Sequence, residues 1–184
     1  MLIAQEKKES NIAEYLLYMW QLEDLFRAHK LNEVSLKKLL IDSLKLDEKK
    51  KDFIWNWYKD LLNDMRKQGI EISGHRSELV EIMNELTYLH QTLINVSRDP
   101  KYLDLYAIAK THLDLLKSKS ANKKLSDIEV AMNGLYGLLL LRLKKSEISD
   151  ETQAAMATFS KMIAYLAATY HKVKNGGISL PGES

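Results

Sequence analysis

Apolar residues recur at three- and four-residue intervals along most of the chain, in segments separated by polar breaks. This spacing places them on one face of an α-helix, and no segment of strand length alternates apolar and polar residues. The sequence has 2 Pro and 7 Gly in 184 residues, where average usage would give roughly 9 and 13. Because both residues interrupt helices, their scarcity favours long helices. The chain is therefore predicted to be all-α.

Capping residues predict where the helices begin. Asp47 and Ser126 can each cap a helix, and Glu129 completes a capping box with Ser126. Asp99 is followed by Pro100, a residue suited to the first helical position. We expect seven helices, over about 10–29, 33–44, 47–68, 77–96, 99–117, 126–144 and 149–174.

Seven helices joined by short loops predict an antiparallel helical bundle. A chain of 184 residues fits one domain. We expect this domain to cover residues 1–175. Residues 176–184, which include the segment ISLPGES, are expected to form a disordered tail.

Composition and charge exclude several classes of function. Cys is absent, which excludes disulfides, thiol nucleophiles and thiolate metal sites. The 27 basic and 25 acidic residues nearly cancel, so a strong nucleic-acid signal is missing. The most apolar run, residues 134–143, is shorter than a membrane span requires, and the first residues become charged too soon for a secretory signal. These features predict a cytoplasmic protein with no membrane partner.

Three ionisable residues fall on apolar helix faces. Glu23 lies among the apolar residues of IAEYLLYMWQLEDLF, His90 lies on the apolar face of the fourth predicted helix, and Arg142 on that of the sixth. A buried charge must be paired or hydrogen-bonded. Arg27, one turn after Glu23, is expected to pair with its carboxylate.

Two interpretations of these residues follow. In the first, each polar group pairs locally or leans toward an end of the bundle, and serves only the structure. In the second, Glu23, His90 and Arg142 meet around a cavity that binds a small anion, with Arg142 holding the anion and Glu23 orienting His90. The structural interpretation is the commoner outcome for buried polar groups in helical proteins.

Other residues are candidates for an interface. Trp55 is predicted to point away from the stripe formed by Phe53, Ile54, Trp57, Tyr58, Leu61 and Met65, either into an interface or against the preceding short helix. The last two helices carry small residues away from their main stripes, which suits tight packing inside the bundle or a homodimer seam. These small residues are Gly134, Gly137, Ala157, Ala164 and Ala168.

Recognisable catalytic and metal-binding motifs are missing from the sequence. It has no Glu-x-x-His motif, no phosphate-binding glycine loop and no GxSxG motif, so no catalytic residue, metal or cofactor is assigned. His75-Arg-Ser-Glu78 has the Glu-x-x-His spacing in reverse order and is a weak match. The lysine runs 49–51 and 123–124 could contact phosphate, but a solvated face is the simpler interpretation.

The segment NIAEYLLYMWQLEDLFRA, together with the preceding IAQEKK, resembles an uncharacterised all-helical family known from Bacteroidetes, a domain of unknown function. The resemblance is strongest over residues 3–28. It implies a compact cytoplasmic helical protein and transfers no catalytic residue. If the family has a site, the resemblance directs attention to Glu14, Trp20, Glu23 and Arg27.

The sequence as a whole favours a non-enzymatic protein-interaction module that binds a protein partner or itself. The alternative is a small anionic-ligand binder or enzyme that uses Glu23, Arg27, His90 and Arg142. A nucleic-acid-associated factor that uses the lysine runs is a weaker third possibility. A packed interior with an apolar surface patch would favour the first class, and a cavity lined by the polar residues would favour the second.

Overall fold

The computed structural model describes residues 2–120 and 122–176, and all regular structure in these residues is helical. The predicted all-α fold is confirmed. The elements are α1 (Leu2–Ser10), α2 (Ile12–Ala28), α3 (Glu33–Lys37), the π-helical turn η1 (Lys38–Asp42), α4 (Glu48–Lys67), α5 (Ser77–Asn95), α6 (Pro100–Lys119), α7 (Asp127–Leu143) and α8 (Asp150–Lys174). Of the predicted tail, residues 177–184 lie outside the described residues.

The predicted caps are present at the starts of α4, α6 and α7. The side chain of Asp47 accepts the backbone N–H of Lys50, and that of Asp99 accepts the N–H of Tyr102. Ser126 and Glu129 form the reciprocal capping box. Each cap satisfies an N–H that would otherwise lack a partner in the first turn. Local sequence therefore determines where these three helices begin.

The first part of the chain has one more helix than predicted. The expected helix over 10–29 corresponds to α2, but residues 2–10 form a separate helix, α1, which packs on α2. Asn11 separates the two helices, because its backbone is extended, with φ −155°, and its side chain accepts the N–H groups of Ala13 and Glu14. Helix α1 was not predicted because most of its residues are polar. Its buried residues include Ala4.

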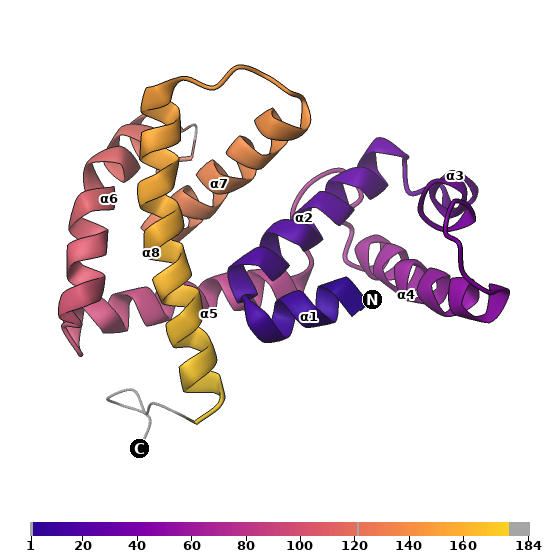
Figure 1. The fold of residues 1–184 in the computed structure, drawn as a ribbon, viewed down its shortest axis with the longest axis horizontal. Coiled ribbons are helices and arrows are strands. Elements are labelled where there is room, and N and C mark those ends of the chain that lie inside the picture. Colours follow the sequence, from indigo (N-terminus) through magenta and orange to yellow (C-terminus); the bar gives the residue numbers. More distant parts are fainter. Residues whose placement is uncertain (1, 121, 177–184) are drawn as a thin grey trace.

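Helices α5 to α8 pack on one another, and α2 packs against α7 and α8. Figure 1 shows α6 and α8 side by side and antiparallel, with α5 crossing them. The pair of α3 and α4 lies at the opposite end of the molecule from α6 (Figure 1). Buried apolar side chains from both ends join in one hydrophobic cluster, which includes Leu16, Phe26, Leu62, Leu86 and Phe159.

The buried face of α4 is wider than the predicted stripe, since Leu61 and Met65 of the stripe are buried and so are residues beside it. Trp55, predicted to point away from that stripe, is only 7% exposed, and Phe53, predicted within it, is 58% exposed. Leu62 follows Trp55 by two turns and is also buried, so the two side chains share a face. Because α4 packs on η1, the burial of Trp55 agrees with the second alternative, packing against the preceding short helix, and Trp55 is not an exposed interface residue.

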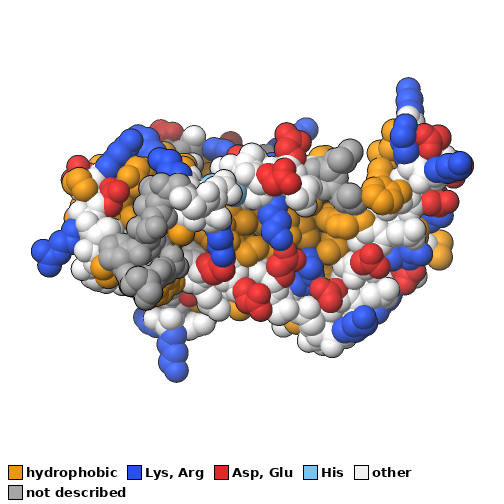
Figure 2. Space-filling view, turned by 90° about the horizontal axis from the view of Figure 1, so that it is seen from below, with side chains coloured by type: hydrophobic (Ala, Val, Ile, Leu, Met, Phe, Trp, Pro, Cys, Tyr) orange, Lys and Arg blue, Asp and Glu red, His pale blue; other side chains and the backbone are white. Residues whose placement is uncertain are grey.

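Charges of both signs are interspersed on the surface. Figure 2 shows acidic and basic side chains alternating over one face, with apolar side chains visible between them. In the run 49–51, Lys50 pairs with Asp47 at 3.1 Å and Lys51 with Glu48 at 3.0 Å. The lysines of this run are therefore partly neutralised by their own helix.

Candidate functional site

Glu23 is buried in the centre of the fold, where its carboxylate contacts the loop between α4 and α5. One oxygen, Oε2, lies 2.6 Å from Nδ1 of His75, and Oε1 accepts the backbone N–H of Arg76 at 3.0 Å. The side chain of Glu23 is 2% exposed. Two hydrogen bonds, both of which can be charge-assisted, offset the cost of burying this carboxylate.

The predicted pair of Glu23 with Arg27 is not formed. The guanidinium of Arg27 pairs instead with Asp24, at 3.0 Å, and donates to the carbonyls of Ile70 and Gly74. The helical spacing was compatible with the predicted pair, but the α4–α5 loop supplies closer acceptors. Glu23 and Arg27 lie one turn apart on α2 and bind the same loop. Glu23 accepts hydrogen bonds from the loop, and Arg27 donates hydrogen bonds to it.

The contact of Glu23 with Arg76 also serves as a cap for α5. Arg76 is the N-cap residue of this helix, and its own side chain makes no capping hydrogen bond. Glu23 accepts the Arg76 N–H, and Gln68 Oε1 accepts the next one, from Ser77, at 2.8 Å. A carboxylate at this position is also favoured by the helix dipole. Residues from α2 and the end of α4 thus provide the cap that the local sequence lacks.

His75 is held in a defined orientation by two neighbours. Its ring stacks on Trp20, with centroids 4.7 Å apart and planes at 20°, and Trp20 makes an edge contact with Tyr136 at 5.6 Å. Because Nδ1 faces the Glu23 carboxylate, Nδ1 carries the hydrogen and Nε2 is left on the opposite edge of the ring. The His75 side chain is 37% exposed.

A cleft of 250 Å³, hereafter the His75 cleft, lies beside this pair. It is bounded by residues of α2, α5 and α7 and the loops before α5 and α7, among them Trp20, His75, Met83, Glu129 and Asn133. Trp20 is 5% exposed, and its Nε1–H has no acceptor among the described residues. The cleft therefore combines an imidazole oriented by Glu23 with the carboxylate of Glu129, whereas the Trp20 Nε1–H is itself shielded from solvent.

His90 belongs to a different environment. It is buried between α5 and α6, with Nδ1 2.7 Å from the Tyr102 hydroxyl and an edge contact to Tyr106. Burial lowers the pKa of His90 to about 4, against the opposing effect of Asp127. The imidazole is therefore neutral at pH 7. These contacts are the local pairing expected of a structural core residue.

The structure does not bring the predicted ligand-binding residues together. Glu23 and Arg27 contact the α4–α5 loop, and His90 contacts tyrosines of α6. Arg142 is exposed near the end of α7, and no ion pair involving it occurs among the described residues. The helical period of α7 alone did not reveal that its last turns extend beyond the core. The single anion-binding cavity lined by Glu23, His90 and Arg142 is therefore not formed.

The small residues on α7 and α8 have different surroundings. A Cβ at Gly134 would lie 3.1–3.2 Å from side-chain atoms of Leu116, Met156 and Phe159, so this glycine permits close packing of α6 and α8 on α7. The position at Gly137 has no such neighbour within 4 Å among the described residues. The three alanines of α8 that were predicted to pack closely are exposed and do not pack inside the fold; they are Ala157, Ala164 and Ala168.

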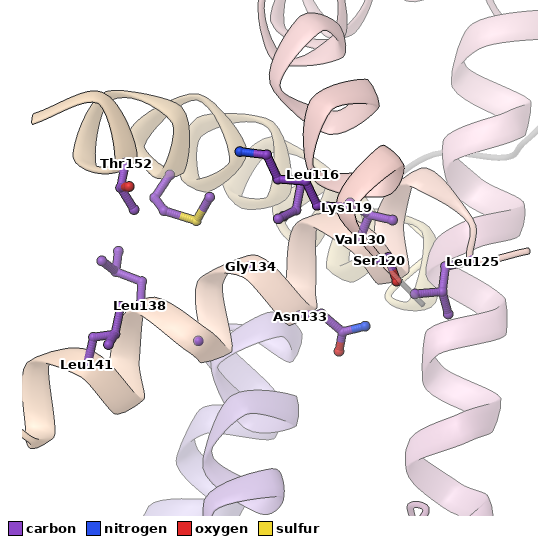
Figure 3. Close-up of a pocket in the computed structure, with 12 residues that line it drawn as sticks. Leu116, Lys119, Ser120, Leu125, Val130, Asn133, Gly134, Leu138, Leu141 and Thr152 are labelled. Atoms are coloured by element: carbon purple, nitrogen blue, oxygen red, sulfur yellow. The ribbon is translucent and has the colours of Figure 1, made fainter. Parts of the chain in front are cut away.

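A second depression, the apolar groove, runs along α7 between α6 and α8 (Figure 3). Its volume is 390 Å³. The α7 side of the groove includes Val130, Gly134, Gly137 and Leu141, which the helical period places on one stripe. Leu116 and Met156 belong to its walls. The sequence showed the glycines but not that they lie in a groove.

Lys119 is the charged residue of this groove. Of the described residues that line the groove, it is the one with an ionisable side chain. Figure 3 shows it extending from α6 over the groove toward the α8 side. Among the described residues, no carboxylate lies within ion-pair distance of its ammonium group. The groove is therefore apolar with one unpaired positive charge.

Within residues 2–120 and 122–176, no three His, Asp or Glu side chains are grouped to hold a metal ion. No helix in this part of the chain is both long enough and apolar enough to cross a bilayer.

The sequence indicated His75 only through a weak metal motif and not as the partner of Glu23, because His75 lies outside the apolar helix faces. The signal was indirect: a buried glutamate requires a partner, and the glycine-flanked segment GHRSE contains both a histidine and the start of a helix. Only the tertiary structure shows that the partner comes from this segment. Of the residues indicated by the family resemblance, Trp20, Glu23 and Arg27 contact the α4–α5 loop or its histidine, and Glu14 pairs with Lys7 at 2.8 Å.

Comparison with known proteins identifies the family. No curated protein and no solved structure is significantly similar to this chain. A family described as a domain of unknown function, DUF4924, matches residues 1–177. The match covers every helix of the fold, including both depressions. The chain therefore belongs to the DUF4924 family, as the resemblance of its first helices predicted.

Proposed function

We propose that this protein is a non-enzymatic protein-interaction module, located in the cytoplasm, whose apolar groove binds an amphipathic helix of a partner protein. The observation that carries the proposal is that α7 is apolar on two faces. One face packs in the core through Ile128 and Met132, and the other is the stripe that lines the groove. Residues 130–141 contain no charge at all. A helix that is apolar all round is normally covered on every side.

The shape and charge of the groove favour a helix as the occupant. A groove with an apolar stripe repeating every three to four residues suits the anchors that a helix presents at i, i+3 or i+4 and i+7. Gly137 leaves the backbone of α7 accessible to a close approach. The unpaired Lys119 selects a partner helix with an acidic residue beside its apolar anchors.

A photo-crosslinking amino acid at Leu141, at the open end of the groove, tests this proposal in cells that express the protein. We expect a crosslink to a specific partner, through a segment with helical apolar spacing and a nearby Asp or Glu. A synthetic peptide of that segment should bind the purified protein, and Lys119→Glu should lower the affinity for this peptide about tenfold.

Gly137→Trp provides the matched control. Because the position is open, the indole should fill the groove without unfolding the protein and should abolish both the crosslink and peptide binding. Crosslinks that persist in Gly137→Trp, or that form no discrete adduct, would contradict the proposal.

Self-association is the second candidate. It is favoured by the exposed row of Ala157, Ala164 and Ala168 on α8, since small side chains permit close helix pairing. Ala164→Arg should then convert a dimer to a monomer in analytical ultracentrifugation. A wild-type protein that remains monomeric at about 100 µM would exclude a stable homodimer.

A further inference from the structure

The apolar groove has one charged residue in an otherwise uncharged lining. Most of its described wall consists of apolar side chains and glycines of α6, α7 and α8. Apart from Lys119, the polar residues of this wall are neutral; they are Ser120, Asn133 and Thr152. The groove therefore suits a ligand that is apolar over most of its length and carries one negative charge.

Lys119 is placed to bind the charged end of such a ligand. It is the last residue of α6, and Figure 3 shows its side chain extending over the groove. The other lysines nearby on α6 have partners, since Lys117 pairs with Asp127 at 3.4 Å and Lys110 pairs with Asp114. Among the described residues, no carboxylate pairs with Lys119. An ammonium group beside an apolar surface attracts a carboxylate more strongly than one surrounded by water.

The size of the groove limits the ligand to a single chain. Its volume of 390 Å³ lies in the lower part of the range for small-molecule pockets, about 300–1,000 Å³. The α7 side runs from Val130 to Leu141, a length of about 16 Å at the helical rise per residue. One alkyl chain of medium length fits along this stripe, whereas the two long chains of a membrane phospholipid do not.

Gly137 gives an alkyl chain direct access to the backbone of α7. A Cβ at this position would have no atom of another described residue within 4 Å. At Gly134, by contrast, a Cβ would lie 3.1 Å from a Leu116 carbon and 3.2 Å from the Met156 sulfur. The floor of the groove is therefore closely packed at Gly134 and open at Gly137, where methylene groups can contact it.

We infer that the apolar groove binds a medium-chain alkyl carboxylate. The alkyl chain lies along α7 over Gly137, and the carboxylate contacts the ammonium group of Lys119. Because this ligand and the proposed partner helix would occupy the same groove, each displaces the other. This competition rests on the proposed function, whereas binding of the carboxylate does not.

NMR titration of the isotope-labelled protein with three probes tests the charged contact. The probes are octanoate, octanol and octylamine, which share one alkyl chain and differ in the charge of the head group. The backbone amides of Gly134 and Gly137 report on the floor of the groove. We expect saturable shifts of these amides. Octanoate should bind about threefold more tightly than octanol, the effect of one exposed ion pair, and octylamine should bind more weakly than both.

A series of chain lengths tests the apolar contact. Hexanoate, octanoate and decanoate carry the same head group, so the contribution of Lys119 is equal in all three. Burial of each additional methylene group should raise the affinity about fourfold. The series therefore measures the contribution of the alkyl chain separately from that of the charge.

Three variants assign the contacts. Lys119→Glu should reverse the preference, so that octylamine binds more tightly than octanoate. Lys123→Met is the matched control, because Lys123 is not part of the described lining and its ammonium group donates to the carbonyl of Ser118 at 3.3 Å. It should retain the order of the wild-type protein. Gly137→Trp fills the groove and should abolish binding of all the probes.

The inference is overturned if octanoate binds no more tightly than octanol, or if Lys119→Glu leaves the order of the three probes unchanged. It is also overturned if the shifts do not saturate and spread over the whole surface, as in non-specific adsorption. Should Gly137→Trp prove unfolded by circular dichroism, the Lys119→Glu comparison decides alone.

Failure of the proposed function is seen separately. In that case octanoate binds with the expected preference, but the crosslinker at Leu141 forms no discrete adduct. If both proposals hold, octanoate should reduce the crosslink to the partner, and octylamine at the same concentration should reduce it less.

Discussion

The carboxylate of Glu23, on α2, accepts a hydrogen bond from the backbone N–H of Arg76, at the start of α5, at a distance of 3.0 Å. These residues are separated in the sequence by α3, η1, α4 and the loops between them. This contact caps α5, while the other carboxylate oxygen of Glu23 orients His75 in the loop that borders the His75 cleft. A charged residue in the core of α2 thus stabilises the start of a different helix.

Replacement of Glu23 should therefore destabilise the whole fold. Glu23→Ala leaves the Arg76 N–H and the His75 Nδ1–H without their acceptor and opens a cavity, and we expect a loss of about 2–4 kcal/mol in the free energy of unfolding. Glu23→Gln preserves the shape and one acceptor, so its loss should be about half as large. Urea unfolding followed by circular dichroism measures both values. A loss below about 0.5 kcal/mol for Glu23→Ala would contradict this role.

The glycines of α7 should respond in opposite ways to the same change. Gly137→Ala adds a Cβ with no atom of another described residue within 4 Å, so the better helix propensity of Ala should stabilise the protein by about 0.5–1 kcal/mol. Gly134→Ala adds a Cβ 3.1–3.2 Å from three side chains. Overpacking should make this variant at least about 1 kcal/mol less stable than Gly137→Ala. Thermal unfolding of the two variants side by side measures the difference.

His90 should make stability decrease on acidification. Its pKa is lowered to about 4 in the folded protein from about 6.5 in the unfolded chain. Between these values the unfolded state binds the additional proton, so the free energy of unfolding falls as the pH decreases from 6.5 toward 4. The contribution at pH 5 is about 2 kcal/mol relative to pH 7.5. Urea titrations at both pH values measure it.

The control for this prediction is His90→Gln, which can still hydrogen-bond to Tyr102 and does not titrate. We expect it to be less stable than the wild-type protein at pH 7.5 but to lose less stability between pH 7.5 and pH 5. An identical pH dependence in both proteins would show that His90 is not responsible.

Trp55 and Phe53 test the buried face of α4. Trp55 is 7% exposed and Phe53 is 58% exposed. Trp55→Ala should lower the free energy of unfolding by about 3–5 kcal/mol, because it empties a buried volume. Phe53→Ala should change it by less than about 1 kcal/mol. Chemical denaturation measures both values. Equal losses in the free energy of unfolding would contradict the burial of Trp55 and the exposure of Phe53.

The capping contacts that the sequence predicted are local. Asp47, Asp99 and Ser126 each accept an N–H from a residue three positions later, so both partners lie in one short segment. The start of α5 was predicted at residue 77 and is found at Ser77, but its capping acceptor, Glu23, lies 53 residues away and could not be identified from the sequence. Likewise, α1 packs on α2, but its sequence is mostly polar, so the spacing of apolar residues did not predict this helix.

The sequence by itself determined the helical class, the positions of most helices and the fact that Glu23 must have a partner, because backbone propensity, capping and the cost of a buried charge depend on residue type and near neighbours. The tertiary structure decided which partners meet. It paired Glu23 with His75 rather than Arg27, turned Trp55 inward and left Arg142 exposed. These outcomes depend on which helix faces are brought into contact, and the spacing of residues within one helix does not contain that information.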